Sequence, residues 1–143
     1  MEATITNTAV ITANVVTPIT VRETINAEEQ SLLTITKSVS PVPVTENGTL
    51  TYTFVIQNLG NTAATEETGV VITDTFNPVL KNLTATFNGT AWTEGADYTY
   101  DEITGMFASV AGKITVPAAT YTQDTTTGAW GINPGVSTLV ISG

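Results

Sequence analysis

The chain has 143 residues, a length typical of one domain, and its net charge of −9 arises from 13 acidic and only 4 basic residues. So few positive charges exclude the basic patch that nucleic acids and anionic membranes attract, and we expect neither as a partner. Because cysteine and histidine are absent, the chain has no disulfide, no His-dependent catalytic centre and none of the commonest zinc and iron ligand sets. We therefore expect no enzyme, no cofactor, no metal and no membrane insertion.

The composition favours strands over helices. Hydrophobic residues make up 41% of the chain and charged residues 12%, which is enough apolar material for a core. Threonine is unusually frequent and, together with Val and Ile, favours extended structure. Because no stretch has the 3.6-residue period of a helix, the sequence predicts an all-β protein.

The first predicted element is a strand over residues 4–15, in which polar and apolar residues alternate. One face is mostly threonine, and the other carries Ile5, Asn7, Ala9, Ile11, Ala13 and Val15. A lone strand can neither bury its apolar face nor satisfy its backbone groups. We therefore expect this strand to complete a sheet, either in its own domain or in a neighbouring copy.

A proline and a polar stretch separate this strand from the rest of the chain. Pro18 is expected to end the strand, and although alternation resumes from Ile19 to Ile25, polar residues follow over 26–31. We interpret residues 17–31 as a linker or hinge. Fully extended, this linker spans at most roughly 50 Å, which permits both placements of the first strand.

The remaining residues predict a series of short strands. Alternating runs cover 32–40 and 49–58, and a further strand is expected over 70–75. Three hairpin turns follow at Asn88-Gly89, 101–105 and 124–128, and the last strand covers 137–142. Strands of this length and spacing predict a two-sheet antiparallel β-sandwich.

Four phrases in this region are similar to a known repeat. They are LTITKSVSP at 33–41, GTLTYT at 48–53, NLGNTA at 58–63 and GVVITDT at 69–75. They resemble the bacterial surface "conserved repeat" family, a domain of unknown function, number eleven. The resemblance implies an immunoglobulin-like (jelly-roll-like) β-sandwich on the outside of a bacterial cell or spore.

The order of the phrases suggests how copies assemble. In tandem members of that family, a phrase resembling residues 3–10 closes a repeat and follows a strand resembling residues 138–143. Here the closing phrase stands first, so the chain resembles a repeat whose last strand has moved to the front. We expect residues 1–16 to act as a donor strand, 17–31 as a hinge and 32–143 as a sandwich lacking its final strand. The chain is then its own partner, in a head-to-tail filament.

An adhesin or an S-layer-type binding module, folded as a closed monomeric sandwich, is the alternative. Its partners are a host surface or other cells, and a face of aromatic residues from the later hairpins is its candidate contact. That face comprises Trp92, Tyr98, Tyr100, Tyr121 and Trp130. Because the start of the chain lacks the features of a signal peptide, we expect another export route, as for appendages made inside a mother cell.

Three polar residues share the register of apolar neighbours on their strands. Lys37 follows Leu33 and Ile35, while Asn58 and Asp74 end runs of inward residues. A buried lysine needs a partner. Either the three lie at strand ends, reach water or pair ionically, or Lys37 and Asn58 form an isopeptide bond with Asp74 as proton shuttle.

Overall fold

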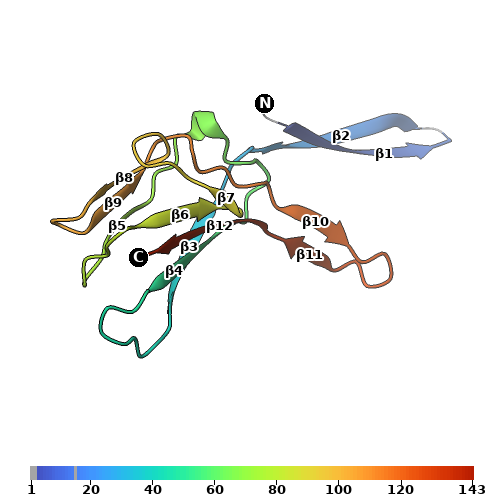
Figure 1. Ribbon diagram of the computed structural model, residues 1–143. Coiled ribbons are helices and arrows are strands. Elements are labelled where there is room, and N and C mark those ends of the chain that lie inside the picture. The colour runs from blue at the N-terminus through green and yellow to red at the C-terminus, as the bar shows by residue number, and fades with distance from the viewer. Residues whose placement is uncertain (1–2, 15) are drawn as a thin grey trace. The chain divides into compact units, whose positions relative to one another are not determined.

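The computed structural model describes residues 3–14 and 16–143, excluding the side chains of residues 3–5, 13, 16 and 23–27. Antiparallel strands make up almost all of its regular structure, which confirms the predicted all-β class (Figure 1). The chain divides into two compact units, Met1–Gln30 and Ser31–Gly143.

The N-terminal unit is a hairpin of two long strands. β1 (Ala3–Ala13) pairs antiparallel with β2 (Val16–Ala27), with Ala3 opposite Ala27 and Ala9 opposite Val21. The segment predicted as a hinge is therefore largely a strand, because its alternation matches that of β1. Only residues 28–32 separate β2 from the next strand.

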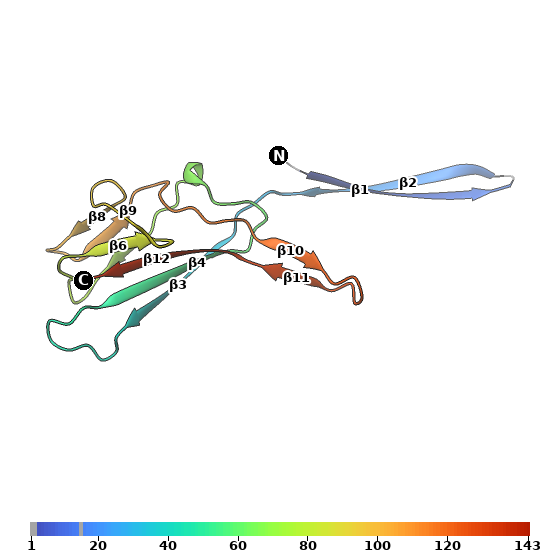
Figure 2. The same cartoon turned by 45° about the vertical axis from the view of Figure 1, so that its right-hand side comes forward.

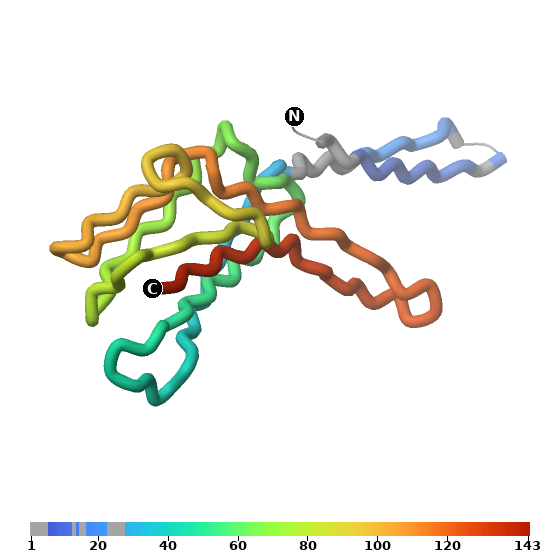
Figure 3. Tube along the Cα trace, viewed as in Figure 1, coloured from blue at the N-terminus to red at the C-terminus, as the bar shows by residue number. Residues whose placement is uncertain are grey.

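The first sheet of the second unit has five strands in the order β3-β4-β12-β6-β7. Figure 3 shows how the last strand of the chain lies in the middle of this sheet. The strands are β3 (Leu33–Ser40), β4 (Thr51–Asn58), β12 (Gly135–Ser142), β6 (Thr84–Phe87) and β7 (Thr90–Ala91).

The second sheet has three strands in the order β5-β9-β8. They are β5 (Thr73–Thr75), β9 (Met106–Ser109) and β8 (Tyr98–Asp101), and a short 3-10 helix, Glu66–Thr68, precedes them. A separate hairpin of β10 (Thr120–Gln123) and β11 (Trp130–Asn133) extends away from both sheets in Figures 1 and 2.

The core lies between the two sheets and confirms the sandwich. Phe107, Ile114, Leu139 and Ile141 are fully buried within it. The ring of Tyr52 on β4 packs against that of Phe76, with centroids 4.7 Å apart. Burial of these side chains supplies the main favourable term in folding this unit.

Candidate functional site

One strand of the first sheet keeps its apolar face in solvent. Ile35 on β3 lies directly opposite Ile56 on β4, so both side chains point to the same face of the sheet. Yet Ile56 is 3% exposed and Ile35 is 50% exposed. The same contrast holds for Tyr52, which is buried, and its partner Val39, which is exposed. The structure therefore covers β4 but leaves Ile35 and Val39 on β3 exposed, while Leu33 at the start of β3 packs partly against the core.

The strand of the second sheet that lies nearest to this gap has a free edge. Among the strands that the structure describes, β5 pairs only with β9. The carbonyl of Ile72, just before β5, accepts a hydrogen bond of 2.9 Å from the Ser109 N–H. In an antiparallel pair these groups alternate in direction, so those of Val71 and Thr73 point away from β9. They form an open edge that ends at Thr75, whose N–H donates to the Asp74 carboxylate at 2.9 Å.

A groove of about 150 Å³ runs between β3 and this free edge. We call it the open groove. Its lining residues are Leu33, Thr34, Ile35, Ile56, Val70, Val71 and Ile72. Every lining side chain except Thr34 is apolar, which suits an apolar strand better than a charged or sugar ligand.

An ion pair closes one end of the open groove. The Lys37 ammonium on β3 pairs with the Asp74 carboxylate on β5, two residues beyond Ile35 and Ile72 respectively. The ammonium also lies over aromatic rings, 4.8 Å from the centroid of Tyr52 and 5.2 Å from that of Phe76. These contacts link the two sheets. They also offset the free energy that an unpaired ammonium beside the core would cost.

Asn58 lies apart from this ion pair. It pairs with Leu33, four residues from Lys37 along β3 and thus roughly 13 Å away. Its buried side-chain oxygen accepts the N–H groups of Leu32 and Gly60, both at 2.9 Å. Its nitrogen donates to the carbonyls of Thr62 at 2.7 Å and Pro117 at 3.1 Å. The amide is fully hydrogen-bonded and fixes loops, so the structure brings Lys37 to Asp74 but not to Asn58.

The predicted donor residues lie in a strand whose apolar side chains face solvent. Opposite Ile11 and Ala9 stand Ile19 and Val21, so these four share one face of the hairpin. Ile11, Ile19 and Val21 are each more than half exposed, and Ala9 and Asn7 are exposed too. Ile5 and Ala13 also belong to β1, but their side chains, like the whole of Val15, lie outside the described part of the chain. The hairpin thus presents an uncovered apolar face.

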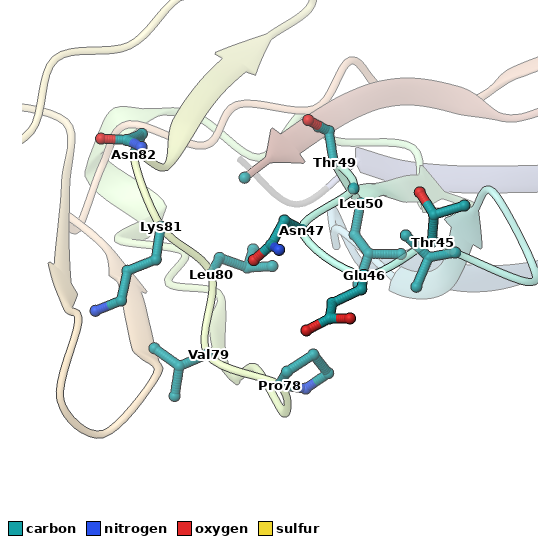
Figure 4. A pocket seen from close by; sticks show the side chains of 13 residues that line it. Thr45, Glu46, Asn47, Thr49, Leu50, Pro78, Val79, Leu80, Lys81 and Asn82 are labelled. Carbon is teal, nitrogen blue, oxygen red and sulfur yellow. The ribbon is translucent and has the colours of Figure 1, made fainter.

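A second cavity, of about 580 Å³, lies between two loops and the final residue (Figure 4). Residues 44–50 and 78–82 form its walls together with Gly143. The Lys81 ammonium in its wall forms an ion pair with the Glu102 carboxylate, which lies outside the cavity, at an N–O distance of 3.3 Å. The hydroxyl groups of the cavity are those of Thr45 and Thr49, and its charged side chains are Glu46 and Lys81.

The aromatic residues considered as a sugar-binding face do not lie on one surface. Tyr98 is buried, and Trp92 and Tyr100 pack against the core. Only Tyr121 and Trp130 are exposed, both on the β10–β11 hairpin. They belong to one face of this hairpin, because Tyr121 pairs with Ile132 and Gln123 with Trp130.

The loop carboxylates are engaged by their own turns. The Ile103 N–H at 2.8 Å and the Thr104 hydroxyl, also at 2.8 Å, lower the pKa of Asp101. The N–H groups of Thr127 and Thr126 lower the pKa of Asp124 in the same way. In the described part of the chain, no three acidic side chains gather as the ligands of a metal ion would.

No helix among the described residues is long and apolar enough to cross a membrane. No family model, no curated protein and no solved structure matches the chain. The open groove and the exposed hairpin face are the features of the structure that indicate a function.

Proposed function

We propose that the chain is the structural subunit of an extracellular filament on a bacterial cell or spore surface. In this filament, the N-terminal strand of one copy completes the sandwich of the next. The observation that carries the proposal is the uncovered inner face of β3 beside the free edge of β5. The surface location rests on the resemblance of residues 33–75 to the repeat family.

Each half of the proposed contact lacks what the other offers. The open groove has exposed apolar side chains and an unpaired backbone edge. The hairpin has an exposed apolar face, and a two-stranded hairpin alone is marginally stable in water. Adding a strand to a sheet edge satisfies the backbone groups, while alternate side chains fill the groove.

The geometry of such a contact determines the type of assembly. Donor and acceptor are different surfaces of the chain, so the contact is heterologous. A heterologous contact that does not close into a ring repeats without limit and builds an open filament. Every copy then lends one N-terminal strand and receives one.

The hydrophobic contribution is of the right order for reversible association. Ile11, Ile19, Val21, Ile35 and Val71 are each about half exposed. Burying the exposed half of each contributes about 1 kcal/mol, so about 5 kcal/mol in all. Association itself costs about 4–15 kcal/mol, so the hydrogen bonds along β5, at about 1 kcal/mol each, have to supply the rest.

Electron microscopy and sedimentation of the purified chain test the proposal. We expect the full chain to form fibres and a 28–143 chain, which keeps the groove but lacks the hairpin, to remain monomeric. Because that shorter chain still accepts a donor, adding it in increasing amounts is expected to shorten the fibres. A full chain that stays monomeric at every concentration contradicts the proposal.

A surface-binding module is the second candidate, and the β10–β11 hairpin favours it. Tyr121 is 48% and Trp130 69% exposed on one face of this hairpin, as expected for side chains that contact a ligand. Binding of a glycan or host protein at this face is expected to shift the fluorescence of Trp130 in a monomeric chain. A Trp130→Ala variant that binds the same ligand unchanged contradicts this role.

A further inference from the structure

The two sheets of the sandwich differ by two strands. The first sheet has five strands and the second has three, while the N-terminal unit holds exactly two strands in a separate hairpin. β3 is at one edge of the first sheet, and residues 70–72, which lead into the free edge of β5, line the same groove. One added strand would pair with β5, and a second beside it would reach over β3.

The composition of the hairpin strands assigns them to these two places. β2 contains Pro18 and the only charged residues between Ala3 and Ala27, which are Arg22 and Glu23. Proline and charged side chains are typical of edge strands, since an edge strand needs no complete ladder and faces water. β1 contains neither proline nor charge. β1 therefore suits an inner position and β2 an outer one.

We propose that the donated element is the whole β1–β2 hairpin of a second copy, with β1 antiparallel on the free edge of β5 and β2 outermost over β3. The inference rests on the proposed function and extends it from one strand to two. The result is a second sheet of five strands in the order β2-β1-β5-β9-β8, facing a first sheet of five. Ala9, Ile11, Ile19 and Val21 then point into the open groove.

The charge distribution is compatible with a second copy as the donor. The 143-residue chain carries a net charge of −9, yet the stretch from Ala3 to Ala27 has one positive and one negative residue. A neutral hairpin approaches the acidic domain of another copy without repulsion. The open groove is apolar and suits the uncharged face of this hairpin.

Strand direction separates donation between copies from folding back. Leu33 and Ile35 line the groove with Val70 and Ile72, and Lys37 pairs with Asp74, so β3 and β5 run in the same direction. If β1 is antiparallel to β5, then β2 runs parallel to β3 and ends beside the end of β3.

The connection within one chain is too short for that arrangement. Ala27 and Leu33 are joined by residues 28–32, whose reach is at most roughly 20 Å. The 8 residues of β3 alone span roughly 25 Å, and a returning connection has to pass around them as well. The same hairpin from another copy has no such constraint.

Disulfide trapping in the full chain tests the strand order, because the native chain has no cysteine. The test uses outward-facing, exposed threonines: Thr8 on β1, Thr20 on β2, Thr73 on β5 and Thr99 on β8. We expect the Thr8→Cys/Thr73→Cys chain, or its Thr6→Cys or Thr12→Cys counterpart, to give a ladder of covalent oligomers on oxidation. Thr20→Cys/Thr73→Cys and Thr8→Cys/Thr99→Cys chains are the matched controls and are expected to remain uncrosslinked.

Each of the other outcomes overturns one stated part of the proposal. If oligomers form through a cysteine at position 20 but through none on β1, then β2 and not β1 lies beside β5. If a monomer forms an intrachain disulfide, then the hairpin docks on its own chain and not on a second copy. Fibres without any crosslink to Thr73 overturn the docking site while the proposed function survives. A monomer without crosslinks overturns both.

A second pair of variants tests whether both strands are donated. Val21→Asp places a charge on the apolar face of β2, whereas Thr20→Asp places it on the opposite face. Docking of the whole hairpin predicts loss of fibres for Val21→Asp and retention for Thr20→Asp. Equal fibre formation by the two variants means that β1 alone is donated.

Discussion

β3 and β4 lie side by side in one sheet and have the same alternating pattern, yet one is exposed and the other is buried. Their facing residues Ile35 and Ile56 differ in exposure by more than tenfold, at 50% and 3%. The difference therefore does not come from the strands themselves. It comes from the other side of the sandwich, which buries Tyr52 and Ile56 on β4 but leaves Ile35 and Val39 on β3 exposed. This exposed apolar face is where the proposed donor strand would dock.

The comparison predicts that shortening a side chain costs more on a covered strand of the first sheet than on β3. Leu139 on β12 is fully buried, so Leu139→Ala is expected to lower the free energy of unfolding of the 28–143 chain by about 2–5 kcal/mol. Ile35→Ala in the same chain is expected to lower it by less than about 1 kcal/mol, because half of its side chain is already in water. Urea unfolding measures both. Similar losses would mean that β3 is covered within its own domain.

The buried amide of Asn58 sharpens the comparison at the point where β4 meets β3 and β12. Asn58→Ala leaves two N–H and two carbonyl groups without their partner, and we expect a loss of about 3 kcal/mol in the free energy of unfolding. Gln57→Ala, at the exposed neighbouring position, is the control and should change it by less than about 0.5 kcal/mol. A tolerated Asn58→Ala would show that water replaces these bonds.

A close backbone approach fixes the start of β12. A Cβ atom on Gly135 would lie 1.8 Å from the Pro117 carbonyl oxygen, whereas one on Gly131 of β11 would meet nothing closer than 3.4 Å. Gly135→Ala is therefore expected to lower the free energy of unfolding by about 2 kcal/mol, with thermal unfolding as the measurement. Gly131→Ala is the matched control. An unchanged unfolding temperature for Gly135→Ala would contradict the close packing.

Acid is expected to lower the stability of the sandwich by protonating Asp97, which lies between β7 and β8. The Thr93 N–H at 2.8 Å, and after it the Lys113 ammonium, lower the pKa of Asp97 from its ordinary value of 3.8. The folded state therefore binds the Asp97 proton less tightly than the unfolded state does. The stabilising contribution of this carboxylate is complete above its ordinary pKa and is lost as the pH falls through the lowered pKa. Asp97→Asn should flatten the fall in stability below pH 4, measured by acid titration of unfolding. An unchanged acid profile would assign the fall to other carboxylates.

Much of this fold follows from local patterns. The alternation over 49–58 predicted β4, and the Asn88-Gly89 turn predicted the β6–β7 hairpin, because Asn88 and Gly89 both take positive φ. The partner of β1 was missed. Residues 19–25 alternate as β1 does, but Pro18 and the absence of an Asn-Gly or Asp-Gly turn concealed the hairpin.

The resemblance predicted a sandwich lacking a strand, but local patterns could not place the open groove, because its position depends on which strands face each other. The alternating pattern around Ile35 predicts an ordinary inward-facing residue, and no neighbouring residue indicates that its side chain is exposed. Lys37 and Asp74 were singled out by their register, but their meeting depends on the packing of two sheets. Asn58 shared that register, and its role became clear only with the loops that it holds.

Labelling of a single cysteine at the open groove tests most directly whether another copy covers β3. In an Ile35→Cys variant of the full chain, the account predicts that the rate of reaction with a thiol reagent falls as the protein concentration rises. The same substitution in the 28–143 chain should react rapidly at every concentration. Equal rates in the two chains, or protection in the full chain that does not depend on concentration, would contradict it.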